Sequence, residues 1–208
     1  MTTTTAIRRR AVSELKRALI LNAARRVFEA EGLEGASLRG IAAQAGYTPA
    51  ALYFHFDSKE AIYAEVLAAS LERLNTAVTS AVSKAKTPAL RFEAAARAWF
   101  EFYVENPSDL DLGFYLFRAR LKPQGLGRER DASLNAALER SLAPLADAAR
   151  ELGADRAKAH EVMAGVFAHA TGVLTLAHTG RIRMLKVDPR AMMAQYITSK
   201  LATLREPL

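Results

Sequence analysis

The chain has 208 residues, a net charge of +7 and no cysteine. Its length suits a small module plus one larger domain, and the lack of cysteine excludes a disulfide framework and thiolate chemistry. No apolar run approaches the roughly 18 residues of a membrane span, and MTTTTAIRRR lacks the apolar stretch of a signal peptide, so we expect a cytoplasmic protein with no membrane partner.

The N-terminal segment is strongly basic. Residues 1–26 carry seven arginines and lysines against one acid, Glu14. A basic arm beside a DNA-binding helix would contact phosphates; the alternative is a solvated, disordered tail. The pattern then predicts a first helix that is capped by Ser13 and ends near Gly32. Its predicted inward residues are Leu15, Leu19, Ala23, Val27 and Phe28.

Two short helices joined by a tight turn are predicted next. Ser37 is a suitable N-cap, and Gly46 suits the left-handed residue that ends a helix. Thr48 caps the following helix with Pro49 at its first position. Asp57 and Glu60 resemble a capping box at the start of a long helix. This layout is typical of a helix-turn-helix module that contacts DNA.

The chain here resembles the TetR family of ligand-responsive transcriptional regulators. The resemblance is carried by ARRVFEAEGLEGASLRGIAAQAG, YTPAALYFHF and DSKEAIYAEVL, which span Ala24 to Leu67. It implies an all-α fold of about nine helices. It also implies a DNA-binding domain over 1–57 with the basic arm, and a helical effector-binding and dimerisation domain over 58–208.

The predicted DNA-binding residues lie on the exposed side of this module and in the arm. Base contacts are expected from the mostly apolar set Tyr47, Thr48, Pro49 and Ala50, with thymine methyl groups as partners, and Arg39 is expected to add a guanine contact. The predicted phosphate contacts are Arg10, Lys16, Arg17, Ser37, Arg39, Tyr53, His55 and Lys59.

The rest of the chain is predicted to be helical, with no alternating β pattern. We expect helices from Ser58 towards Lys86, from Pro88 to Asn106, from Ser108 to before Pro123, from Arg128 to Leu152, from Asp155 to near Gly180, and from Pro189 to Arg205. The helix from Ser58 would be a lever of roughly 40 Å that links the DNA module to the body.

Aromatic residues gather on the predicted helices that begin at Pro88 and at Ser108. They are either ordinary core or the lining of a pocket for a small, apolar or aromatic effector, which the resemblance places in the C-terminal domain. The predicted ligand-binding residues are Trp99, Phe102, Tyr103, Phe114, Phe117, Met163, Phe167, His169 and Ala170.

The helix after Asp155 carries two stripes of small or apolar residues. One contains Ala164, Ala168 and Gly172, and the other contains Met163, Phe167, Ala170 and Leu174. They indicate either a fully buried core helix or a helix shared between the core and a second subunit. The last helix offers Met193, Ile197, Leu201 and Leu204 as a companion face. Since the family pairs its last two helices into a four-helix bundle, we expect a homodimer on a pseudo-palindromic DNA operator.

An enzyme or a helical scaffold without a DNA role is the alternative. His160, His169 and His178 are nine residues apart and cannot share a metal on one helix, and Gly125 with Gly127 lacks the third glycine of a dinucleotide loop. We therefore expect no catalytic site, no metal and no cofactor.

Overall fold

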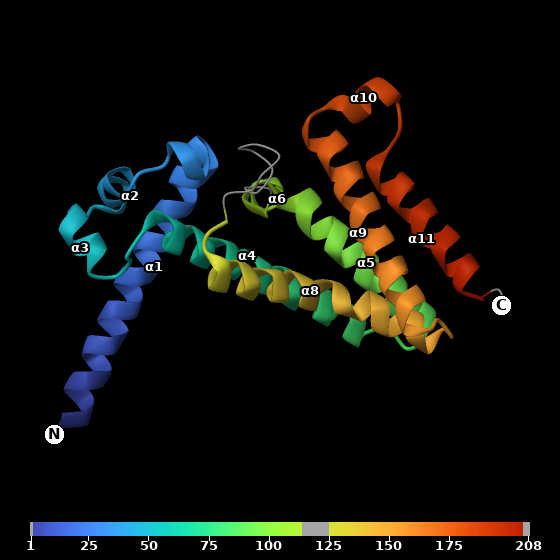
Figure 1. The fold of residues 1–208 in the computed structure, drawn as a ribbon, viewed down its shortest axis with the longest axis horizontal. Coiled ribbons are helices and arrows are strands. Elements are labelled where there is room, and N and C mark those ends of the chain that lie inside the picture. Colours follow the sequence, from blue (N-terminus) through green and yellow to red (C-terminus); the bar gives the residue numbers. More distant parts are fainter. Residues whose placement is uncertain (1, 114–124, 206–208) are drawn as a thin grey trace. The chain divides into compact units, whose positions relative to one another are not determined.

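The computed structural model describes residues 2–113 and 125–205. In these residues the chain forms ten α-helices and no strand, which confirms the predicted all-α class (Figure 1). The helices are α1 (Thr2–Gly35), α2 (Leu38–Ala45), α3 (Pro49–Tyr53), α4 (Lys59–Ser83), α5 (Pro88–Glu105), α6 (Pro107–Gly113), α8 (Arg128–Glu151), α9 (Arg156–His178), α10 (Arg181–Leu185) and α11 (Pro189–Arg205). None of the helices in this described part has the length and hydropathy needed to cross a membrane.

The first helix is longer than predicted. It begins at Thr2, so Ser13 lies within it and does not cap it. No proline or glycine interrupts residues 2–31, and the kink comes only at Gly32, whose φ of 71° suits glycine. The predicted inward set is half right, because Ala23, Val27 and Phe28 are buried while Leu15 and Leu19 are 63% and 48% exposed.

The chain divides into two compact units. One contains Met1–Ser70 and Ser108–Leu134, and the other contains Leu71–Pro107 and Asn135–Leu208. Helix α4 contributes residues to both units. The predicted functional division between residues 57 and 58 is a different kind of boundary, and it stays a prediction.

The start of α4 lies one residue later than the capping-box prediction requires. The backbone N–H of Ala61 donates to Ser58 Oγ at 3.1 Å, so Ser58 and not Asp57 is the cap. Asp57 is instead paired with Arg130 at 3.2 Å. Serine and aspartate are both good caps, and the sequence alone does not decide between two adjacent ones.

In the second unit, several helix boundaries lie at the predicted capping residues. Thr87, Asp155 and Asp188 each accept a hydrogen bond from the backbone N–H three residues later, at 3.3, 2.7 and 2.7 Å. Gly153, with a φ of 105°, follows α8. The prediction missed α10, a five-residue helix between Gly180 and Lys186. Both flanking residues have a positive φ, and only the glycine is a recognisable signal in the sequence.

The predicted stripes on α9 lie in different environments. Ala164, Ala168 and Gly172 are exposed, whereas Ala170 and Leu174 are fully buried. On α11 the predicted companion face is wrong for a partner, because Met193, Ile197 and Leu204 are buried within this chain. They belong to the core that α11 forms with α5 and α9, which leaves the polar side of α11 outermost.

Candidate DNA-binding site

The helix-turn-helix is built by the predicted caps. Ser37 Oγ accepts from the N–H of Gly40 at 3.1 Å, and Thr48 Oγ1 accepts from the N–H of Ala51 at 3.2 Å. Gly46 has a φ of 73°, where a side chain would be strained, and Pro49 is the first residue of α3. Figure 1 shows α2 and α3 beside α1. The turn therefore sets the direction of α3 by local hydrogen bonds and backbone conformation.

The outer side of α3 carries most of the predicted base-contact set. Thr48, Pro49 and Ala50 are exposed and Tyr47 is half-buried, while Leu52 beneath them is fully buried. Tyr53 is 60% exposed. These residues form one surface, and most of it is apolar.

Phe54 is part of this surface, although the sequence analysis did not select it. Its side chain is 85% exposed and its ring lies edge-on to His55, with centroids 5.4 Å apart. Helix α3 ends at Tyr53, so helical spacing does not determine the direction of the following residues. An aromatic triplet at a helix end is the available signal, and it does not say which ring is outermost.

Arg17 binds within the module, and its predicted phosphate contact stays a prediction. Its guanidinium pairs with Glu65 and donates to the carbonyl of His55 at 3.0 Å. It also stacks over the ring of Phe56, 4.3 Å from the centroid. These contacts tie α1 to α4 and to the segment that follows α3.

Lys59 is a second internal tether. Its Nζ donates to the carbonyls of Leu33, Glu34 and Ala36 at 2.9, 3.3 and 3.2 Å. A cation is favourable at the C-terminal end of a helix, where carbonyls lack partners. Three carbonyls at and just after the end of α1 thus accept from this ammonium, and its predicted phosphate contact stays a prediction.

The remaining predicted phosphate contacts are spread over the surface. Ser37, Arg39 and Lys16 are exposed, and His55 is half-buried. Arg10 is paired with Glu14 at 3.0 Å, with both side chains largely exposed. An open hollow of about 290 Å³ joins part of α1 to the segment around α3. Its lining residues are Arg9, Val12, Ser13, Lys16, Tyr47, Ala51, Phe54 and His55.

A buried ion pair joins α1 to α6. Asp109 is fully buried and accepts from Arg25 at 2.8 Å, while Glu29 accepts from the same guanidinium at 2.9 Å. Burial lowers the pKa of Arg25, but the hydrogen bonds to Glu29 and Asp109 outweigh it, and the pKa is raised overall. Nearby, Tyr63 Oη donates to the carbonyl of Leu112 at 2.8 Å. Helix α6 is thus held to both α1 and α4.

The predicted ligand-binding residues fall into two groups. Trp99 contacts Tyr103 and Phe167 edge-on, with centroids 4.7 and 5.5 Å apart, and its Nε1 donates to Ser141 Oγ at 3.3 Å. Phe102 joins this cluster through Tyr103. His169 stacks instead on Tyr196 of α11, with centroids 3.9 Å apart. Phe114 and Phe117 lie outside the described residues.

The three histidines of α9 have separate environments. His160 contacts the carbonyl of Arg156 at 2.8 Å, and His178 contacts that of Tyr103 at 3.1 Å. Burial lowers the pKa of His169, and its Nε2 has no hydrogen-bond partner. In the described part of the chain, no three His, Asp or Glu side chains are grouped so that they could hold a metal ion.

The comparisons with known proteins agree with this module. Residues 20–66 match the model of bacterial regulatory proteins of the tetR family. The chain is 34% identical over 93 residues to the transcriptional activator FasR from Mycolicibacterium smegmatis, covering 45% of this chain and 42% of FasR. It is 29% identical over 93 residues to the uncharacterised regulator YobS from Bacillus subtilis. The matched stretch thus spans less than half the length of these relatives.

Solved structures share the fold over most of the chain. A protein of unknown function from Rhodococcus sp. RHA1 has a TM-score of 0.72 at 23% identity, covering 92% of this chain and 96% of that one. FadR from Bacillus subtilis, solved with stearoyl-CoA, has a TM-score of 0.69 at 17% identity, covering 88% and 97%. Residues 20–66 thus carry the pattern of bacterial regulatory proteins of the tetR family, and the fold of the chain is shared with these solved structures over most of its length.

Proposed function

We propose that this protein is a DNA-binding transcriptional regulator, acting as a repressor that leaves a pseudo-palindromic operator when a small, largely apolar effector binds. The observation that carries the proposal is the capped α2–turn–α3 module, which presents Thr48, Pro49 and Ala50 on an exposed surface. A short helix with its N-terminal residues exposed suits insertion into a major groove.

The apolar character of this surface favours contacts to thymine methyl groups over bidentate hydrogen bonds. Arg39, Tyr53 and His55 supply polar groups at its edges, where phosphates would lie. Since phosphate contacts are independent of sequence, specificity would rest on Tyr47, Thr48, Pro49 and Ala50. The operator should accordingly be sensitive to replacement of thymine by uracil.

A binding experiment tests this site directly. The probe is duplex DNA from upstream of the encoding gene, with binding measured by fluorescence anisotropy against an unrelated duplex. Ala50→Asp places a carboxylate on α3, so we expect at least about a tenfold loss of affinity. Ala136→Asp makes the same exchange at an exposed position of α8, in the other unit, and should bind normally. Equal affinities for Ala50→Asp and the parent would refute the assignment of α3.

We propose further that the chain acts as a homodimer through α9 and the outer, polar side of α11, whose apolar face is buried within the chain. The exposed small residues of α9, Ala164, Ala168 and Gly172, would allow close approach of a second helix. One recognition helix contacts too few base pairs for useful specificity, so two are needed. Ala168→Arg should yield a monomer in sedimentation and lose operator affinity. A parent chain that is monomeric at micromolar concentration would contradict this proposal.

The effector site is proposed at the ring cluster of Trp99, Phe102, Tyr103 and Phe167, with Met163 and Ala170 nearby on α9 and His169 as a polar group. The fold likeness to FadR, which was solved with stearoyl-CoA, supports an apolar effector. Trp99 is the single tryptophan of the chain, so its fluorescence can follow titration with fatty acids and acyl-CoAs. Ala170→Phe should abolish the response while operator affinity persists, and Ala157→Phe at an exposed site of α9 should leave it unchanged. A folded Ala170→Phe variant that responds normally would refute this site.

This role is regulatory and not enzymatic, and it places the protein with DNA in the cytoplasm. FasR is named an activator, so the sign of regulation needs its own measurement. Transcription from the bound promoter in a purified system, with and without the protein, gives that sign. We expect transcript to fall on addition of the protein, and a rise would replace repression by activation.

A further inference from the structure

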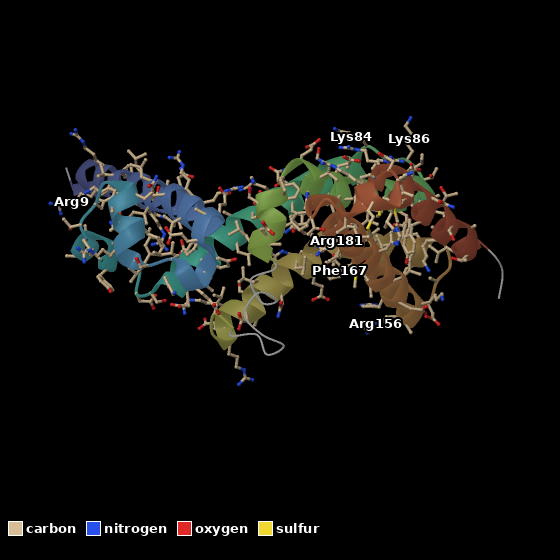
Figure 2. The ribbon with its side chains drawn as sticks, turned by 90° about the horizontal axis from the view of Figure 1, so that it is seen from above. Arg9, Lys84, Lys86, Arg156, Phe167 and Arg181 are labelled. Atoms are coloured by element: carbon tan, nitrogen blue, oxygen red, sulfur yellow. The ribbon has the colours of Figure 1, made fainter. Side chains whose placement is uncertain are left out.

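The N-terminal half of α1 is a helix that extends beyond the packed module. Ile20 is its first buried residue, and among residues 6–19 only Arg17 is partly covered. About 18 residues at 1.5 Å each give an extension of roughly 27 Å. Figure 2 labels Arg9 on this part of α1. The basic segment is therefore a helix with distinct faces.

Only one face of the extension borders the hollow next to α3. Arg9, Val12, Ser13 and Lys16 line it from α1, and they recur at three- and four-residue spacing, as one helix face requires. Arg8 and Arg10 are not among the lining residues. Of the three consecutive arginines, the hollow thus includes the middle one, while Arg10 pairs with Glu14.

The chemistry of this hollow is cationic. Besides Arg9 and Lys16, the lining contains the hydroxyls of Ser13 and Tyr47 and the imidazole of His55. It contains no carboxylate. A cavity of about 230 Å³ near the other end of α1 has the opposite character, because Glu29, Glu31, Glu34, Glu60 and Asp111 line it with Lys59 as its single cation. The basic hollow therefore reflects local placement of charge, beyond the net charge of the chain.

We propose that a DNA backbone strand lies in this hollow, with Arg9 and Lys16 contacting phosphates and the Ser13 hydroxyl donating to a phosphate oxygen. This inference rests on the proposed function, since the far wall of the hollow comes from α3 and the residues beside it. The strand would be the one that borders the groove entered by α3. The extension thereby lengthens the contact along the DNA, and Arg10 takes no part in it.

A preformed helix makes such contacts at low entropic cost. A disordered arm must be ordered on binding, whereas Arg9, Ser13 and Lys16 are already aligned by the helix. Each phosphate contact releases counterions and contributes about 0.9 to the slope of log affinity against log salt. The number of contacts is therefore measurable without knowledge of the base sequence.

The test compares Arg9→Ala with Arg8→Ala, which remove the same charge from adjacent positions. Affinity for the upstream duplex is measured from about 0.05 to 0.3 M salt. Arg9→Ala should reduce the salt slope by about one and weaken binding roughly tenfold at 0.1 M salt. Lys16→Ala should do the same, while Arg8→Ala should change neither quantity, because Arg8 is exposed and does not line the hollow.

The outcomes separate this inference from the proposed function. If the parent binds and Ala50→Asp abolishes binding while Arg9→Ala keeps the parental slope, the hollow is not a DNA site although α3 is. Equal losses for Arg9→Ala and Arg8→Ala would show a diffuse positive field and would also overturn the inference. If the parent does not bind the duplex at all, the proposed function itself fails. Circular dichroism of each variant checks that α1 remains helical.

Discussion

The two units of this chain differ in the contacts that stabilise each of them internally. In the unit that contains the helix-turn-helix, charged side chains join the helices: Arg17 binds Glu65, Arg25 binds Asp109, and Lys59 binds carbonyls at the end of α1. The other unit contains a ring cluster, with Trp99 against Tyr103 and Phe167. Its interhelical ion pairs, Arg91–Glu151 and Arg190–Glu101, are partly exposed, whereas Asp109 of the first unit is fully buried. Helix α3 has five residues and buries one of them, Leu52, so packing alone offers little to fix its position. Hydrogen bonds, from the Thr48 cap and from Arg17 to the carbonyl of His55, therefore help to fix the position of α3.

The largest expected effect comes from the ring cluster. Trp99→Ala removes a side chain that is 2% exposed and leaves a cavity, so the free energy of unfolding should fall by about 3–5 kcal/mol. Denaturant unfolding measures the change. Phe54→Ala removes an aromatic ring that is 85% exposed and should shift it by less than about 0.5 kcal/mol. A small loss for Trp99→Ala would mean that the second unit is not organised by its rings.

The ion pair between α1 and α6 should come next. Arg25→Ala leaves the fully buried Asp109 without its guanidinium, which costs about 3–5 kcal/mol when both partners are buried. The Arg25 side chain is 29% exposed, so water compensates in part and we expect about 2 kcal/mol. The double variant Arg25→Ala, Asp109→Ala should be more stable than Arg25→Ala alone. If it is less stable, the charge left behind is not the cause.

A smaller effect is expected at the turn. Gly46→Ala meets no neighbouring atom, but it forces a side chain into a left-handed conformation at a φ of 73°. The cost should be about 1 kcal/mol in unfolding free energy, with weaker DNA binding because α3 begins three residues later. Gly172→Ala, within α9 and also free of close neighbours, provides the matched control and should be neutral or stabilising. Equal costs at both glycines would contradict the strain argument.

The smallest effect concerns pH. Burial and the charge of Lys200 lower the pKa of His169, against a raising effect of the Met192 backbone. The unfolded chain therefore takes up a proton near pH 6.5 that the folded chain resists, so stability is full above this pH and decreases below it. Thermal unfolding at pH 7.5 and 5.5 should show a smaller decrease for His169→Gln than for the parent. His160→Gln, at an exposed position of the same helix, should behave like the parent.

Most of the fold could be predicted because its helix ends are encoded locally. Thr87, Asp155 and Gly153 mark boundaries through bonds or conformations within a few residues, and Ser37, Gly46 and Thr48 do the same in the turn. The same local signals placed the exposed surface of α3. Ser13 was the failure of this kind, since a serine can cap a helix only where the chain is not already helical.

The partners of charged residues could not be predicted in this way. Arg17 and Glu65 are 48 positions apart, and Arg25 and Asp109 are 84 apart, so no local pattern links them. Arg17 was expected to contact phosphate as part of the basic arm, and Lys59 as part of the helix-turn-helix module. Whether a cation faces solvent or another helix depends on tertiary packing, and no local pattern indicates that Arg9 lines the hollow while Arg10 does not.

The three bonds of Lys59 have a consequence for its chemical reactivity. An amine-modifying reagent needs a nitrogen with an available lone pair and free access, and this one is directed at the carbonyls of Leu33, Glu34 and Ala36. Lys59 should therefore be acylated more slowly than the exposed Lys84 and Lys86. Its rate of modification, followed by mass spectrometry, would report how often the end of α1 separates from the start of α4. The acylation rate of this single lysine is thus a measure of motion within the DNA-binding module.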